Sequence, residues 1–169
     1  MKNKLNIFLL TSFLLAVAIY FWASSLHSKQ VGDIPFDLSI DNSEFVVCDE
    51  DQIDQYYLAD TYYEGGKRAI KKELSKILND LEFEFEFDKS GTITFRFVVN
   101  CTNQIGRFRT KMVNENLKST SFKSSNIKQM QETIKNLKHW HAGKWNNQPI
   151  DTYYNLSFKI QNGKITDIF

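Results

Sequence analysis

Few side chains in this sequence have types and spacings that suggest chemistry, and none completes a catalytic set. His139 and His141 flank Trp140, and on a strand both imidazoles would lie on one face. No Cys, Asp or Glu stands close in sequence to complete a metal-ligand set, so we interpret the pair as the cationic end of a helix. Gly65-Gly66-Lys67 lacks the spacing of a phosphate-binding loop and is explained better by the start of a helix.

Two rows of charged residues are also present. The acidic row of Glu82, Glu84 and Glu86 has the ligand type that Ca²⁺ prefers, but such a row is more often the solvated face of a strand. The basic row belongs to an expected hairpin: Arg96, Arg107, Arg109 and Lys111. With 21 basic and 20 acidic residues, the chain has no bulk charge that would favour nucleic acid. We therefore expect no enzymatic activity, no cofactor, no metal ion and no nucleic-acid partner.

The N-terminal residues 1–28 are expected to be a membrane anchor or a signal segment. Lys2 and Lys4 precede an uncharged run from Ile7 to Ala23. This run is longer than the h-region of a signal peptide, roughly 7–15 residues, and close to the length of a spanning helix. We expect an anchor with its N-terminus in the cytoplasm. The alternative is cleavage at the small residues Ala23 and Ser25. Either way the rest of the chain is expected to leave the cytoplasm.

The two cysteines, Cys48 and Cys101, both follow this segment. An even count in an oxidising compartment favours a disulfide over a metal site. We expect Cys48 to pair with Cys101, and the alternative is two buried free thiols, because sequence does not show whether they are close.

A polar linker at residues 29–47 is expected to lead into one domain at residues 48–169. Gly65-Gly66 then opens a helix whose apolar stripe follows 3.6-residue spacing: Ile70, Leu74, Ile77, Leu78 and Leu81. Three alternating segments predict strands, with the central one the clearest: Leu81 to Phe87, Thr92 to Val99, and Arg107 to Val113. The inward side chains of the last two are Ile93, Phe95, Phe97, Val99, Phe108 and Met112.

A second helix and a long strand follow. Ser124 or Ser125 is expected to cap the helix, and Trp140 to Gln148 is expected to be a loop. Pro149 to Ile160 alternates as a strand whose inward side chains are Ile150, Thr152, Tyr154, Leu156, Phe158 and Ile160.

Asn162-Gly163 is a strong hairpin signal that leads into the last residues, Lys164 to Phe169. The order of elements predicts an α+β fold. We expect two helices packed on one face of a three- to four-stranded antiparallel sheet.

Several pieces of this pattern, taken in order, resemble the C-terminal domain of the TonB family in its Bacteroidetes form. They cover roughly Cys48 to Phe169: Gly65-Gly66, Ser90-Gly91-Thr92, Phe95 to Asn100, Trp140, Gly143-Lys144, Asn147, and Tyr153 to Phe158. The resemblance implies that the last long strand lies at a sheet edge and accepts an extended peptide of an outer-membrane transporter. It also implies an inner-membrane protein with its C-terminal domain in the periplasm, or a periplasmic protein if the signal is cleaved.

From this resemblance we expect a non-catalytic envelope adaptor that binds its partner by strand addition, in TonB-dependent transport. The expected peptide-binding residues alternate along the strand, on the face away from the core: Asp151, Tyr153, Asn155, Ser157 and Lys159.

Two features differ from the family pattern. The chain has two prolines, so it has no long Pro-rich rod, and the run from Ile7 to Ala23 has no acidic, basic or histidine side chain of the kind that proton coupling uses. The alternative function is therefore a structural envelope module that keeps the fold without energy transduction.

Overall fold

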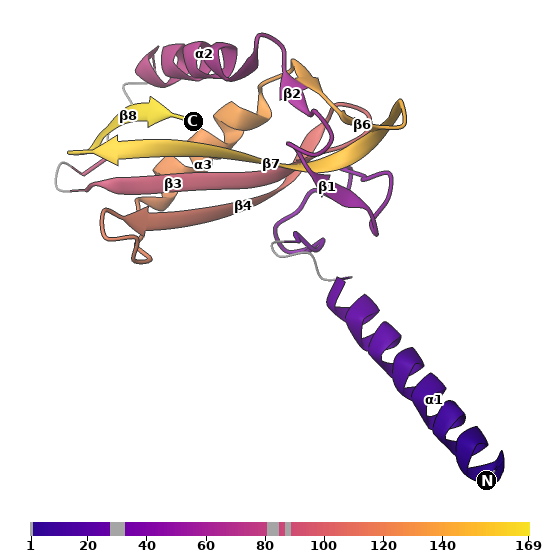
Figure 1. Ribbon diagram of the computed structural model, residues 1–169. Coiled ribbons are helices and arrows are strands. Elements are labelled where there is room, and N and C mark those ends of the chain that lie inside the picture. Colours follow the sequence, from indigo (N-terminus) through magenta and orange to yellow (C-terminus); the bar gives the residue numbers. More distant parts are fainter. Residues whose placement is uncertain (1, 28–32, 81–84, 87–88) are drawn as a thin grey trace. The chain divides into compact units, whose positions relative to one another are not determined.

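The computed structural model describes residues 2–27, 33–80, 85–86 and 89–169. It divides into two compact units, Met1–Pro35 and Phe36–Phe169 (Figure 1). The first unit holds helix α1 (Lys2–His27), and large apolar side chains such as Phe8 and Leu14 are exposed on it. In the part of the chain that the structure describes, no helix combines the length and the hydropathy required to cross a membrane. The anchor from Ile7 to Ala23 stays a prediction.

The second unit is built on a mostly antiparallel sheet, which is six-stranded over the described residues and has the order β1-β7-β3-β4 (Figure 1). Strands β6 and β8 also pair with β7, and the pairing of β1 with β7 is parallel. The strand bounds are β1 Ile53–Gln55, β3 Gly91–Val99, β4 Ile105–Asn114, β6 Gly143–Trp145, β7 Gln148–Gln161 and β8 Lys164–Ile168. The expected α+β class is confirmed, but the sheet has more strands than the three or four expected.

One hydrophobic core joins the helices to the sheet. Helices α2 (Gly66–Asp80) and α3 (Ser124–Lys135) contact each other and contribute an apolar stripe each. The side chains buried in this core alternate along β3 and β7 and repeat at helical spacing along α2 and α3: Ile70, Leu74, Leu78, Ile93, Phe95, Phe97, Val99, Met130, Ile134, Tyr154, Leu156, Phe158 and Ile160. Burial of these apolar surfaces is the main stabilising contribution to the domain.

Two local predictions are wrong. The residue at the N-cap of α3 is Lys123, which makes no side-chain capping hydrogen bond, and neither Ser124 nor Ser125 takes that position. The expected loop from Trp140 to Gln148 contains β5 (Trp140–His141) and β6, because β5 pairs with β2 (Tyr62–Tyr63) and β6 pairs with β7. The strand predicted from Leu81 to Phe87 lies largely outside the described residues.

The segment that enters the domain packs on it from Phe36 onward, although residues 29–47 were expected to be a linker. Asp41 accepts two hydrogen bonds of 2.8 Å from the guanidinium of Arg109. The ring of Phe45 lies so close to Gly106 that a Cβ there would be 2.3 Å from it. We call residues 36–60 the lead-in segment, since it connects to the sheet through β1.

Candidate functional site

The candidate site is the side of β7 that faces away from β3, where the sequence predicted an open edge. That side is paired with β1 at Asp151–Tyr153 and with β8 at Phe158–Gln161. Strand β8 returns along β7 because Asn162 and Gly163 adopt the positive φ values of a tight hairpin, 49° and 75°. The prediction that β7 lies at a sheet edge is therefore wrong.

Asn155 lies in the gap between these covering strands. The backbone of Ser157 exchanges two hydrogen bonds with Phe169, and the carbonyl of Tyr153 accepts from the N–H of Tyr56. Backbone groups alternate in direction along a strand, so the N–H and C=O of Asn155 point to this same side, away from β3. Within the described residues, no backbone group pairs with Asn155 there.

The five predicted peptide-binding residues do share the sheet face opposite the helices, but they are not equally accessible. Asn155 and Lys159 are exposed, and Ser157 is half-buried with its hydroxyl 2.9 Å from that of Thr94. Tyr153 is 3% exposed and Asp151 is 1% exposed. The lead-in segment covers this end of the face, so these two side chains are not on the surface as the sequence alternation predicted.

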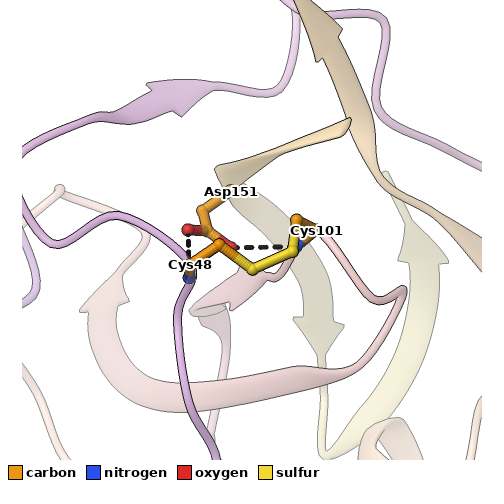
Figure 2. Close-up of side chains that lie close together, drawn as sticks. All are labelled: Cys48, Cys101 and Asp151. Atoms are coloured by element: carbon orange, nitrogen blue, oxygen red, sulfur yellow. Dashed lines mark hydrogen bonds between the residues drawn. A yellow bond between two sulfur atoms is a disulfide. The ribbon is translucent and has the colours of Figure 1, made fainter. Parts of the chain in front are cut away.

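Asp151 holds the lead-in segment in place through its carboxylate (Figure 2). One oxygen accepts a hydrogen bond from the backbone N–H of Cys48 at 2.6 Å. The same oxygen accepts from the N–H of Asp49 at 2.8 Å. The other oxygen accepts from the N–H of Cys101 at 2.8 Å. Three backbone N–H groups donate to this buried carboxylate, which leaves it few lone pairs for a binding partner. The role of Asp151 is therefore structural.

The expected disulfide between Cys48 and Cys101 is confirmed. Their Cα atoms are 6.2 Å apart, within the usual range for a disulfide. The two sulfurs and an Asp151 oxygen also lie within 4.8 Å of one another, as the ligands of a metal ion do. Metal binding by cysteine requires thiolates, and both sulfurs are in the disulfide. The cluster therefore links the lead-in segment to the turn after β3.

The expected basic face of the central hairpin is largely neutralised by the lead-in segment. Arg107 is 5% exposed and forms an ion pair with Glu50, whose pKa is lowered chiefly by that hydrogen bond. Arg109 pairs with Asp41, and the same kind of hydrogen bond lowers the pKa of Asp41. Lys111 is exposed. Arg107 and Arg109 therefore form contacts within the domain, with the lead-in segment.

The two histidines do not form the helix end that the sequence suggested. Helix α3 ends at Lys135, and His141 lies in β5, where its ring stacks on Tyr62 with centroids 4.5 Å apart. His139 Nδ1 is 3.5 Å from a carboxylate oxygen of Glu64.

The sequence matches no protein-family model, and no curated protein and no solved structure is significantly similar to it. The resemblance to the TonB C-terminal domain therefore stays a prediction from the motifs quoted above.

Proposed function

We propose that the domain is a non-catalytic adaptor of the cell envelope that binds an extended segment of an envelope or outer-membrane protein by strand addition. In this proposal two helices pack on one face of the sheet, and the partner pairs with β7 from Asn155 toward Gln161. TonB-dependent transport is the process that the family resemblance suggests for such an adaptor.

The proposal rests on the main chain of Asn155, which no backbone group of the described residues pairs with and which lies directly beside the short strand β8. Strand addition needs main-chain donors and acceptors on an accessible strand. Asn155 supplies one such position. On the same side the backbone of Ser157 pairs with Phe169, and Lys159 lies opposite Asp167 of β8. A partner that pairs at Asn155 extends along β7 by taking the place of β8.

The alternative is a structural envelope module, and a specific observation favours it as the second candidate. Strand β7 pairs with β3 along Thr152–Ile160, and on its other side with β1 at Asp151–Tyr153 and with β8 at Phe158–Gln161, so the native chain already uses most of its backbone groups. A module of this kind binds no peptide along β7.

We also propose that Leu5 to Ala23 keeps the protein in the inner membrane, with the domain in the periplasm. The uncharged run after Lys2 and Lys4 supports this proposal. Mass spectrometry of the native protein is expected to find the original N-terminus. A mature chain that starts at Ser24 or Leu26 would show a cleaved, periplasmic form instead.

The matched variants Asn155→Pro and Asn155→Ala test the adaptor proposal. A peptide that binds the full-length protein is first selected from a displayed library of extended sequences. Asn155→Pro removes the N–H in the gap and is expected to abolish binding, whereas Asn155→Ala keeps that N–H and is expected to bind within about twofold of the native protein. Equal binding by the native protein and the proline variant, with native circular dichroism, would exclude pairing at this position.

A further inference from the structure

A second feature lies apart from the β7 gap. The described residues form a surface pocket of about 720 Å³ where the turn after β1, the turn after β3 and the β6–β7 hairpin meet. This volume is within the range of pockets that bind small molecules, roughly 300–1,000 Å³. Its lining includes Asp60, Tyr62, Asn103, His141, Lys144 and Asn147.

The frame of the pocket is fixed by contacts between segments that are far apart in sequence. The N–H of Lys144 donates to the carbonyl of Ala59 at 2.8 Å, and the N–H of Ala142 donates to Oδ1 of Asn103 at 2.7 Å. Cys101, which also lines the pocket, is held by the disulfide. A frame tied in this way loses little conformational entropy when a ligand binds, which favours affinity.

Small residues also line the pocket. Ala59 and Ala142 line it and are themselves 2% and 8% exposed. Gly143 packs against Ala59, since a Cβ at Gly143 would be 2.7 Å from the Cβ of Ala59. This close packing holds β6 against the turn after β1, and both segments carry larger side chains that line the pocket.

Two aromatic side chains, Tyr62 and His141, form part of the lining. The rings of Tyr62 and His141 are stacked, with an interplanar angle of 12°, and Tyr62 remains 52% exposed. An exposed π-face of this kind attracts the positively polarised C–H groups of a flat, partly polar ligand.

The remaining lining groups match a ligand that donates and accepts hydrogen bonds at many positions. Asp60 offers acceptors, Lys144 offers donors, and the amides of Asn103 and Asn147 offer both. Among these described lining residues one carboxylate and one ammonium balance in charge, so the pocket has no excess field for a phosphate or a multiply charged ligand.

We propose that this pocket binds a neutral saccharide. Sugar hydroxyls are both donors and acceptors, as these side chains require, and the apolar face of a pyranose ring fits a tyrosine platform. Hydrolysis of a glycosidic bond generally uses two carboxyl groups that flank the bond. Among the described residues that line the pocket, Asp60 supplies the one carboxylate, so the inference is of binding and not of catalysis.

Calorimetric titration of the full-length protein with cellobiose, maltose and chitobiose tests the inference, with Gly-Gly and Ala-Ala as peptide probes. At least one disaccharide is expected to bind saturably, and neither dipeptide is. Tyr62→Ala is expected to weaken that binding by about five- to tenfold. Asp60→Asn is also expected to weaken it, and Asn tolerates the positive φ of 53° at this position as Asp does.

Tyr57→Ala is the matched control, because Tyr57 is 65% exposed but does not line the pocket. It is expected to bind the disaccharide as the native protein does. The inference is overturned if no disaccharide binds saturably, if a dipeptide binds in its place, or if folded Tyr62→Ala and Asp60→Asn proteins both keep native affinity.

Discussion

Asp151 shows at the residue scale what sequence alternation predicts and what it does not. Its side chain points away from the helical core, as its place between Ile150 and Thr152 indicates. Its burial comes from the lead-in segment, whose backbone N–H groups at Cys48 and Asp49 reach it from about a hundred positions away. Periodicity along one strand carries no information about a segment so distant in sequence. The sequence therefore predicted a peptide-binding role for Asp151, whereas in the structure Asp151 holds the lead-in segment.

Asp41 gives a residue-scale prediction about pH. The hydrogen bond from Arg109 lowers the pKa of Asp41, whose side chain is 2% exposed. A carboxyl with a lowered folded pKa stabilises the fold above its unfolded pKa, about 3.9, and that contribution is lost as pH falls through the folded pKa. Urea unfolding is expected to give a free energy that drops below about pH 4.

The variant Asp41→Asn is expected to be less stable than the native protein at pH 7 and to lose less stability between pH 5 and pH 3. Some acid sensitivity remains, because the pKa of Glu50 is lowered as well by its hydrogen bond from Arg107. An Asp41→Asn protein with the native acid dependence would contradict this role for the pair.

At the element scale, the length of an element decided whether the sequence predicted it. Helix α2 and strands β3 and β7 are long enough to repeat their apolar period several times, and the sequence located all three. Strands β1, β5 and β6 have two or three residues, too few for a period to show. They are strands because distant segments pair with them, and such pairing is absent from local sequence.

The disulfide gives the prediction at this scale. It closes a separation of 53 residues, so the double variant Cys48→Ser, Cys101→Ser is expected to lose roughly 4 kcal/mol in free energy of unfolding. Hydrogen exchange at the N–H of Tyr56, which bonds to Tyr153, is expected to speed up more than exchange within β3.

Alkylation of the unreduced, denatured native protein provides the chemical check. We expect neither Cys48 nor Cys101 to be labelled before reduction and both to be labelled after it. Labelling of both in the unreduced protein would show free thiols.

At the scale of the whole molecule, the longer elements of the domain follow the order α2, β3, β4, α3, β7, β8, which is the order of helices and strands that the sequence predicted. The order of elements does not show which strands lie at the edges of the sheet. In the structure Lys164–Ile168 pairs with β7 and covers its Phe158–Gln161 part. The hairpin turn at Asn162-Gly163 was therefore the informative signal, because it directs the C-terminal residues back along β7.

Removal of Lys164 to Phe169 tests the central claim, strand addition at β7, most directly. The measurement is the affinity of the full-length and the shortened proteins for one library-selected peptide, with circular dichroism to establish that both are folded. Gly163→Val is the second variant, since it strains the turn and loosens β8 while it keeps every residue of that strand. The adaptor account predicts that binding persists or rises in both variants, because β8 no longer competes for the backbone of β7. Loss of binding in a folded protein that lacks β8 would contradict it.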